Sequence, residues 1–393
     1  MQGESPLSIS LLEVLSSFKL GSGITNAVFN YLKHLSNSLA ITIFTNSLKP
    51  KDKSIVERMG IKVIEASTSP LLYESQLLKF LKRYIKAFDV IEVSAIPRPI
   101  TLLFIKNIIA KTQAKAKIVL NMTGYGLPVW KNNLLDTLWD NIYPRLFMFR
   151  EQLNLAFKSV DIITCVSRSI IEEIKKVNHK VDTKKIIYLP NPIDLQIFKP
   201  LPKTHLLGYL ETLSDSYPTL IFVGLLVRRK APHLIPLFTK YALKTWPKLH
   251  FIVVGRGPLE QKFRYLIRKL GVQKHIILLN EVSTLELVKL YNISNIFFMP
   301  SYYEGFCLPV VEAMATGTPV VVREKYALAE HLYFSKAGKG FKNDNLLEII
   351  GAINDVLDNH DEYKLNALRY AQLFDSRKIA ILRMTQYEKL ISR

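Results

Sequence analysis

The feature that most constrains the fold of this chain is an alternation of short apolar runs with helical stretches, which occurs twice along the 393 residues. The first half begins with a predicted strand at 8–15 (SISLLEVL), a glycine-containing loop at 20–23 (LGSG), a helix at 24–35 and a β-branched strand at 40–45. Further apolar runs predict strands at 88–94, 117–123 and 161–167. Strands that are apolar on both faces and separated by helices favour a parallel sheet covered by helices on both sides.

The second half repeats this pattern after an interruption. Residues 189–200 (LPNPIDLQIFKP) contain three prolines and lead into a polar stretch that reaches Ser216, which predicts a domain boundary. Apolar runs then predict strands at 219–226, 250–258, 275–280, 295–301 and 318–322. We therefore predict an α/β protein with two Rossmann-like, doubly wound parallel-sheet domains, one over 1–200 and one over 201–374, that face each other across a cleft.

The net charge of +20 indicates an anionic partner. Residues 1–195 hold 26 Lys and Arg against 16 Asp and Glu, and the remaining residues hold 27 against 17, so each half carries +10. This even spread favours a general attraction to a phosphate-rich surface over a dedicated nucleic-acid-binding arm. An ordinary basic cytosolic protein is an equally good interpretation of the charge.

The number of cysteines and the apolar runs indicate in which cellular compartment we expect the protein. The two cysteines, Cys165 and Cys307, are too few for a disulfide framework or a thiolate zinc site, which favours a reducing environment. No basic residue precedes Lys19, and no run of about 18 apolar residues occurs. We expect a cytoplasmic protein without an export signal or a membrane-spanning segment.

Residues 301–322 (SYYEGFCLPVVEAMATGTPVVV) contain two carboxylates in a setting that suggests ligand binding. Glu304 is predicted on the loop after a buried strand, and Glu312 one turn into a helix at 308–316 that Gly317 ends. The backbone N–H groups between them lie at a helix N-terminus, which attracts anions, and they belong to Gly305, Phe306, Cys307 and Leu308. A phosphate flanked by two acids suits a nucleotide sugar, whereas for an isolated pair of acids a solvated loop and helix surface is the commoner explanation.

Residues 300–321 (PSYYEGFCLPVVEAMATGTPVV) resemble the signature of the retaining glycosyltransferases of family 4, which have the GT-B fold. Other segments match that family in the same order, and they lie at 20–23, 189–200, 222–235 (FVGLLVRRKAPHLI), 253–263 (VVGRGPLEQKF) and 295–301. The resemblance covers nearly the whole chain and is densest in the second half. It also implies a C-terminal helix at about 375–393 that packs back on the first domain.

The resemblance assigns roles to these residues. Glu312 would accept hydrogen bonds from the ribose hydroxyls of the donor, and Glu304 would hold the hydroxyls of the transferred sugar. The amides of residues 306–308 would cradle the sugar and the diphosphate. Lys230 occupies the place of a family lysine on the donor diphosphate, where a cation stabilises the charge that develops on the leaving group. By themselves, three basic residues at 227–230 (VRRK) are more often solvent-facing.

On the donor side the chain departs from the family at one position. Leu225 stands where relatives commonly have an arginine after the strand glycine, and we expect Arg228 or Arg229 to substitute for it. The N-terminal loop should approach the diphosphate from the opposite wall through Gly21, Ser22 and Gly23, although a single Gly-x-Gly is also typical of a plain turn.

On the acceptor side, relatives often carry a histidine after the strand at 117–123, whereas this chain ends that strand at Thr123. The acceptor proton could then pass to the departing phosphate oxygen. Glu92 and Arg98, near a neighbouring strand end, are candidates for acceptor contact together with Thr123. Glu330 lies where relatives have an acid after a glycine-rich loop, but this chain lacks those glycines, so a surface helix position is an equal alternative.

Two segments suggest a lipid-linked acceptor. Residues 76–88 (QLLKFLKRYIKAF) have one apolar and one basic helical face, which suits adsorption to anionic lipid. A helix that covers the sheet and leaves its lysines in solvent explains the same pattern. Residues 125–149 contain two tryptophans where family members shape the acceptor pocket.

Together these observations predict a retaining glycosyltransferase that moves a sugar from a nucleoside diphosphate sugar to a lipid-linked or glycan acceptor, at the cytosolic face of a membrane that it binds peripherally. No DxD triplet occurs, so we expect no metal and no cofactor. One alternative is a nucleotide-sugar epimerase of similar fold. The other is a non-enzymatic basic binding module, although we expect no nucleic-acid partner because the chain has no RNA-reading aromatic motif.

Overall fold

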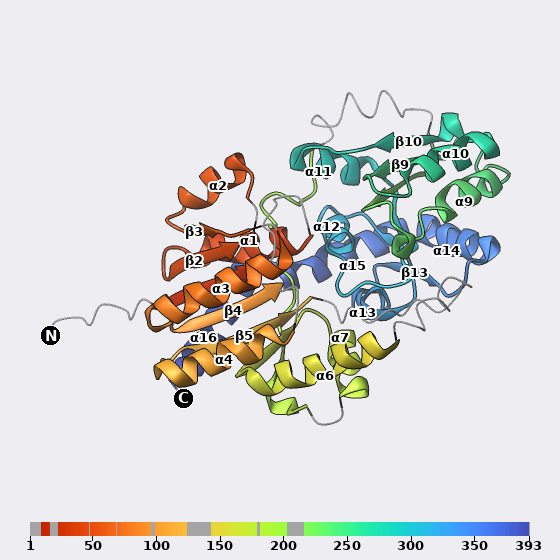
Figure 1. Cartoon of the computed structure of the whole chain (residues 1–393). Coiled ribbons are helices and arrows are strands. Elements are labelled where there is room, and N and C mark those ends of the chain that lie inside the picture. The colour runs from red at the N-terminus through yellow and green to blue at the C-terminus, as the bar shows by residue number, and fades with distance from the viewer. Residues whose placement is uncertain are drawn as a thin grey trace. The chain divides into compact units, whose positions relative to one another are not determined.

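The computed structural model of the chain describes residues 9–15, 23–46, 48–67, 69–95, 99–123, 143–178, 181–202 and 216–392. These residues form two compact units (Figure 1), unit 1 from Met1–Pro192 with Ser376–Arg393, and unit 2 from Ile193–Asp375. The division after Pro192 falls inside the proline-containing segment in which a boundary is predicted, although we predict it at residue 200.

Unit 1 is built on a seven-stranded sheet with the order β3-β2-β1-β4-β5-β6-β7, in which every neighbouring pair is parallel. The strands are β1 (Ser10–Leu15), β2 (Ala40–Thr45), β3 (Lys62–Glu65), β4 (Val90–Ala95), β5 (Lys117–Met122), β6 (Ile162–Cys165) and β7 (Ile186–Tyr188). Leu11, Leu12 and Val14 of the inner strand β1 have no exposed surface. Glu13 of β1 is in register with Glu92 of β4, so two acids lie side by side in this core.

The helices of unit 1 cover its sheet. They are α1 (Gly23–Leu35), α2 (Pro50–Glu57), α3 (Pro70–Tyr84), η1 (Ile85–Ala87), α4 (Thr101–Thr112), α6 (Tyr143–Ser159), α7 (Arg168–Val177), η2 (Thr183–Lys185) and α16 (Ser376–Ile391). Helix α16 comes from the far end of the chain and is drawn in blue among the red to yellow elements of unit 1 (Figure 1). It packs against α1. Its residues Ala380, Tyr387 and Leu390 are buried in the core of unit 1, so the last helix belongs to the N-terminal unit.

Unit 2 has a six-stranded parallel sheet with the order β10-β9-β8-β11-β12-β13. The strands are β8 (Thr219–Val223), β9 (His250–Val254), β10 (Ile276–Leu279), β11 (Ile296–Met299), β12 (Val320–Arg323) and β13 (Gly338–Phe341). The helices are η4 (Arg228–Lys230), α9 (Leu234–Ala242), α10 (Glu260–Leu270), η5 (Gln273–His275), α11 (Thr284–Ile293), α12 (Leu308–Ala315), α13 (Tyr326–Ser335), α14 (Leu346–Asp358), α15 (His360–Ala371) and η6 (Gln372–Phe374).

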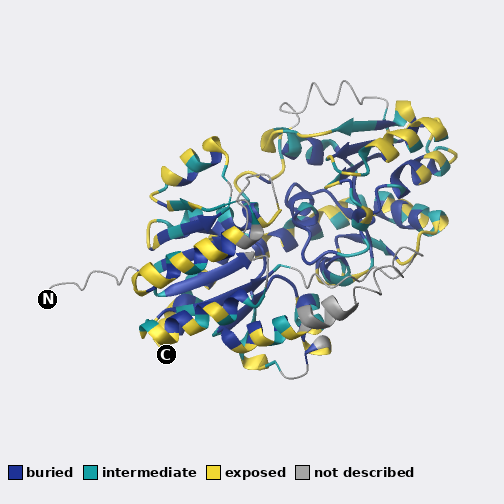
Figure 2. Ribbon diagram, in the orientation of Figure 1, coloured by how far each residue is buried: buried dark blue, intermediate teal, exposed yellow. Residues whose placement is uncertain are grey.

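The strand order of unit 2 identifies where a ligand would bind. From β8 the chain runs outward through β9 to β10, and it then returns to form β11 on the other side of β8. The loops after β8 and β11 therefore diverge at the carboxyl edge of the sheet, the position at which open α/β sheets bind ligands. In unit 2 the inner strands β9, β8, β11 and β12 are buried along most of their length (Figure 2), so these loops present the chemistry.

Three short strands, β3, β7 and β13, are absent from the sequence prediction. All three lie at sheet edges, and they have only four, three and four residues. β13 has the sequence GKGF, which lacks an apolar run. A Cβ at Gly338 would lie 1.8 Å from the carbonyl oxygen of Val320, so backbone proximity, and not hydrophobicity, determines the residue at this position.

Candidate functional site

The loops after β8 and β11 bring the three predicted catalytic residues into one charged cluster. Glu304 follows β11, and its Oε1 lies 2.9 Å from Lys230 Nζ and 2.9 Å from Arg229 Nη1. Both cations belong to the η4 turn after β8. Glu304 and Lys230 are each only 7% exposed. The fold thus pairs side chains that are more than seventy positions apart in the chain.

The two cations keep Glu304 ionised. Burial alone would raise the pKa of this carboxyl group, but the charges of Lys230 and Arg229 and their hydrogen bonds outweigh it and lower the pKa below its usual value. An ionised carboxylate only accepts hydrogen bonds. Glu304 is therefore suited to hold sugar hydroxyls or to stabilise positive charge, and unsuited to act as a general acid near neutral pH.

The side chain of Lys230 lies beside the backbone of Gly224, the residue directly after β8, and extends from there to Glu304. A Cβ at Gly224 would lie 2.8 Å from Lys230 Cδ and 3.1 Å from Lys230 Nζ, so only glycine leaves room for this path. The turn ends at Ala231, whose φ of 47° is left-handed and sends the chain on toward α9. Local backbone geometry therefore directs the ammonium group.

Arg229 joins the two loops through both its side chain and its backbone. Its Nη1 donates to the carbonyl oxygen of Tyr303 at 2.5 Å, and its own carbonyl oxygen accepts from the Tyr302 N–H at 2.8 Å and from Ser301 Oγ at 3.1 Å. Arg228, the other arginine predicted to replace the family arginine, is exposed, as is Leu225 at 58%. Of the two arginines, Arg229 is the one that contacts Glu304.

The turn between the two predicted acids presents free backbone donors. Among the described residues, none accepts a hydrogen bond from the backbone N–H groups of Gly305, Phe306, Cys307 and Leu308. Cys307 has the left-handed values φ 70° and ψ 71° and precedes α12, so the turn leads directly into a helix N-terminus. Burial raises the pKa of the Cys307 thiol to about 12, so the thiol is neutral and the site has no thiolate to repel an anion.

Glu312 lies one turn into α12, as predicted, and is 8% exposed. Its Oε2 accepts a hydrogen bond of 3.0 Å from the hydroxyl of Tyr291 in α11. Burial raises the pKa of Glu312 to about 7, although Tyr291 and Lys230 act in the opposite direction. Glu304 and Glu312 therefore differ: the first is ionised through the physiological range, and the second titrates within it.

Two further residues of this site escaped the sequence prediction. Tyr291 orients Glu312, and His331 of α13 contacts the carbonyl oxygen of Phe306. Neither follows a glycine loop or a strand end, where sequence patterns place binding residues. Motif spacing in the sequence could not have identified them, because each contacts the site by a side chain from a different helix of unit 2.

The predicted acceptor residue Glu92 lies in a different environment from the one expected. It is fully buried in the unit 1 sheet, where Arg383 forms an ion pair with it and the Tyr387 hydroxyl donates to it. Both oxygens of the carboxylate are thus occupied by α16. This environment argues against contact with an acceptor.

The other N-terminal predictions are described only in part. Gly21, Ser22 and Arg98 lie outside the described residues, as do 125–142 of the aromatic segment. Gly23 is the first residue of α1, and half-buried Thr123 follows β5. Glu330 is half-buried on α13.

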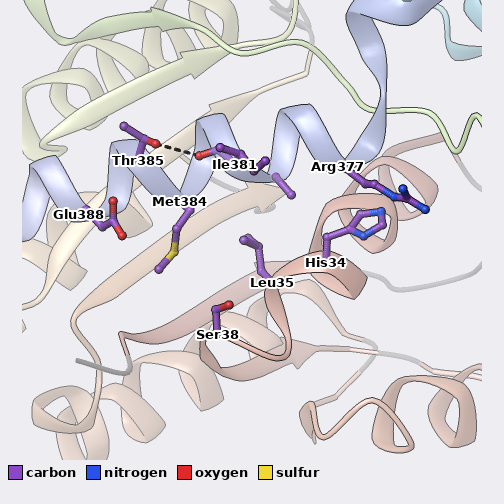
Figure 3. Close-up of a pocket in the computed structure, with 9 residues that line it drawn as sticks. His34, Leu35, Ser38, Arg377, Ile381, Met384, Thr385 and Glu388 are labelled. Atoms are coloured by element: carbon purple, nitrogen blue, oxygen red, sulfur yellow. Dashed lines mark hydrogen bonds between the residues drawn. The ribbon is translucent and has the colours of Figure 1, made fainter. Parts of the chain in front are cut away.

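A groove in unit 1 contains none of the predicted site residues. It lies between α1 and α16 (Figure 3) and has a volume of about 430 Å³. Its lining residues are His34, Leu35, Ser38, Arg377, Ala380, Ile381, Met384, Thr385 and Glu388. Leu35, Ile381 and Met384 are drawn near its middle (Figure 3), and we assign no ligand to it.

Within the described ranges, no three His, Cys, Asp or Glu side chains are grouped so that they could hold a metal ion. Over the same ranges, every helix is too short or too polar to traverse a lipid bilayer.

Comparison with known proteins finds a family match within unit 2. Residues 211–372 match the family Glycosyl transferases group 1. This matched segment contains the charged cluster of Glu304, Lys230 and Arg229, the turn at 305–308 and Glu312. The chain is 30% identical to an uncharacterized glycosyltransferase of Methanocaldococcus jannaschii over 184 residues, and this alignment covers 44% of this chain and 45% of that protein. It is 29% identical over 184 residues to the Escherichia coli UDP-Gal:alpha-D-GlcNAc-diphosphoundecaprenol alpha-1,3-galactosyltransferase, and this alignment covers 44% of this chain and 47% of that protein.

Solved structures identify the fold as GT-B, which confirms the predicted class of two Rossmann-like domains. Anabaena HepE in complex with UDP and glucose superposes with a TM-score of 0.77 at 15% identity, covering 97% of this chain and 99% of that one. Sucrose-phosphate synthase of Thermosynechococcus elongatus gives 0.80 at 17% identity, covering 98% and 99%. The matches to the two sequence relatives, in contrast, span slightly less than half of those proteins.

Proposed function

We propose that this chain is a retaining glycosyltransferase that moves a sugar from a nucleoside diphosphate sugar to a lipid-linked or glycan acceptor. The match of residues 211–372 to group 1 glycosyltransferases supports a transferase, and the complexes of HepE with UDP support a nucleotide sugar as its donor. Retention of configuration and the kind of acceptor are our extension of these findings.

The observation that carries the proposal is the order of groups along residues 304–312. An ionised carboxylate held by two cations comes first, then four backbone donors without a partner among the described residues, then a second buried carboxylate. A nucleotide sugar has the matching order of sugar hydroxyls, diphosphate and ribose hydroxyls. Donors at a helix N-terminus suit the central diphosphate, and carboxylate oxygens suit the hydroxyls at both ends.

In the proposed reaction, the bond between the anomeric carbon and the diphosphate oxygen breaks and its electron pair leaves with the nucleoside diphosphate. The acceptor hydroxyl oxygen forms the new bond to that carbon on the same face, and its proton passes to the departing phosphate oxygen. Charge on the diphosphate grows as the bond breaks, so Lys230 stabilises the transition state more than the bound donor. Glu304, which is ionised, stabilises the positive charge that develops on the sugar ring.

Association with an anionic membrane surface forms the second part of the proposal. The apolar residues Leu77, Leu81 and Ile85 are buried against the unit 1 core, so they are unavailable for insertion into lipid. The basic residues nearby remain exposed: Lys82, Arg83, Lys86 and Lys111 line a concavity of about 600 Å³ at the ends of α3 and α4. Among the described residues, no acid forms an ion pair with any of these four side chains. We therefore propose electrostatic adsorption, worth about 1 kcal/mol per basic residue near the surface.

Activity measurements on variants test the transfer reaction. Glu304→Ala and Lys230→Ala should each lower kcat by about a hundredfold or more, since each removes charge stabilisation from the transition state. Glu281→Ala removes an exposed carboxylate of the same unit, 3.7 Å from Arg256, and serves as the matched control with near-normal turnover. Near-normal turnover in Glu304→Ala or Lys230→Ala would contradict the assigned role.

Nucleotide titration separates the transferase from its rivals. A transferase or an epimerase should bind one of UDP, GDP and ADP saturably, whereas a general basic module should bind all polyanions without saturation at a defined stoichiometry. An epimerase releases free nucleoside diphosphate without any acceptor. Strict dependence of nucleotide release on an added acceptor therefore supports the transferase.

Sedimentation with phosphatidylglycerol vesicles at low salt tests the membrane part. The triple variant Lys82→Glu, Arg83→Glu, Lys86→Glu should lower the bound fraction at least about tenfold. Lys176→Glu, Lys184→Glu, Lys274→Glu, which changes the same net charge at exposed positions elsewhere, should lower it less. Equal loss in the two triple variants would contradict a localised membrane surface.

A further inference from the structure

His331 makes two hydrogen bonds that fix its ring in one state. Its Nε2 lies 2.6 Å from the carbonyl oxygen of Phe306, and its Nδ1 lies 3.1 Å from the hydroxyl of Tyr370. A carbonyl oxygen can only accept, so Nε2 carries the hydrogen and Nδ1 accepts from Tyr370. His331 is 3% exposed, and burial lowers its pKa to about 4, so the ring is neutral near pH 7.

The partner of Nε2 belongs to the peptide unit that connects Phe306 with Cys307. In a planar trans peptide the C=O and the N–H point in opposite directions. Holding the Phe306 carbonyl toward His331 therefore directs the Cys307 N–H away from α13. This N–H is one of the four donors that have no acceptor among the described residues.

The same contact supports an unfavourable backbone conformation. Cys307 has φ 70°, a left-handed value that costs a non-glycine residue about 1–2 kcal/mol. The Phe306 ring packs edge to face on His331 with a centroid distance of 4.8 Å and on Phe374 at 5.4 Å. The hydrogen bond to the Phe306 carbonyl and the contacts of the Phe306 ring thus hold the residue that directly precedes the left-handed position.

We propose that His331 is a positioning residue that aims the Cys307 N–H at the diphosphate of the donor. This inference rests on the proposed function, because it presumes that residues 305–308 bind a diphosphate. It assigns to a residue of α13, outside the loop, the task of preorganising an anion-binding donor before the ligand arrives.

Binding of UDP and of uridine to the full chain, measured by calorimetry, tests this inference. His331→Phe keeps a ring of similar shape but removes the Nε2–H donor, so it should weaken UDP binding about tenfold or more. Uridine has no phosphate, so its affinity should stay within about twofold. His331→Gln restores an N–H near the position of Nε2 and should recover most of the UDP affinity. An equal loss for UDP and uridine, or no loss of UDP affinity, would overturn the inference.

A control and a second measurement keep the test decisive. His275→Phe removes a similar contact, between Nδ1 and the Leu249 carbonyl oxygen at 2.9 Å, away from the turn, and should leave both affinities unchanged. If His331→Phe fails to fold, the wild-type chain labelled with 15N-histidine decides: the Nε2–H signal of His331 should shift when UDP saturates, and an unchanged signal would overturn the inference. If the wild type binds UDP, GDP and ADP without saturation, the proposed function fails, and that outcome is separate from any effect of His331.

Discussion

The side chain of Lys230 lies so close to the α-carbon of Gly224 that a β-carbon there would sit 2.8 Å from its Cδ and 3.1 Å from its Nζ. This contact holds the ammonium group 2.9 Å from Glu304. Glycine at the end of β8 is therefore part of the charged cluster, although it contributes no functional group of its own. Any side chain at this position must push the lysine away from the acid.

Gly224→Ala should lower kcat by about tenfold or more by displacing Lys230 from the developing charge. Its φ of 157° also disfavours alanine, so we expect a lower melting temperature as well. A double-mutant cycle separates the two effects: in a Lys230→Ala background, Gly224→Ala should cause little further loss of kcat.

Gly351→Ala is the matched control for that change. Gly351 lies in α14, and a Cβ there would meet nothing within 4 Å, so the control should keep full activity and slightly gain stability. Fully additive losses of kcat in Gly224→Ala and Lys230→Ala would contradict the mechanism.

Glu312→Gln should change how stability depends on pH. Burial raises the pKa of Glu312 from 4.5 to about 7, so the folded state holds its proton more tightly than the unfolded state. Wild-type stability should therefore fall by up to about 3 kcal/mol as pH rises from 4.5 to 7 because of this group, and Glu312→Gln should remove that part of the fall. Denaturant unfolding at several pH values measures the difference.

The same variant should show the binding role of Glu312. Above pH 7 the wild-type carboxylate accepts ribose hydrogen bonds, so Glu312→Gln should bind UDP more weakly there, by about tenfold. Below pH 6 the two proteins should bind alike, because wild-type Glu312 is then protonated. Glu362→Gln, at an exposed position in α15, should affect neither property. A pH-independent affinity ratio between Glu312→Gln and the wild type would contradict the role.

The sequence predicted the parts of the site that lie on consecutive residues. Apolar runs predicted the strands that form β8 and β11, and a parallel sheet puts the carboxyl ends of both, which lead to Lys230 and Glu304, at one edge. The structure adds that the two strands are neighbours. Glycine and proline signals placed the turn and helix that contain Glu312. Chain connectivity alone puts these groups at one edge, so periodicity was sufficient.

Contacts made by side chains across the fold were beyond sequence reasoning. Tyr291 and His331 lie on helices whose patterns resemble any sheet-covering helix, and only packing reveals which carboxylate or carbonyl they meet. Glu92 is the opposite case, a residue that sequence reasoning included in the site although the structure places it in the core of unit 1. Its place near a strand end suggested an open site, but Arg383, nearly three hundred positions away, fills that space.

Chelation tests the expected independence from metal. The chain lacks a DxD triplet, and the proposed counter-charges for the diphosphate are Lys230 and Arg229. Transfer activity should therefore stay within about twofold after dialysis against EDTA. A tenfold or greater loss that Mg²⁺ or Mn²⁺ restores would show that the diphosphate needs a cation beyond those of the protein.

Arg383→Met should strongly destabilise unit 1. Arg383 is 1% exposed and forms an ion pair with Glu92, which lies in register with a second buried acid, Glu13. Burial, and then the charge of Glu92, raise the pKa of Glu13 well above its usual value, so Glu13 favours its neutral form. Glu92 is the acid with which Arg383 forms its ion pair. Removing the arginine leaves a buried charge uncompensated, which costs about 3–5 kcal/mol.

The double variant Arg383→Met with Glu92→Leu tests this reasoning, because it removes both charges. It should recover most of the stability lost in Arg383→Met, since a buried ion pair and an apolar pair of similar volume are often close in free energy. Arg377→Met changes a residue at the start of the same helix and should cost far less. Denaturant unfolding of the three proteins measures the effect, and a double variant as unstable as Arg383→Met would show that the arginine stabilises α16 by packing and not by neutralising Glu92.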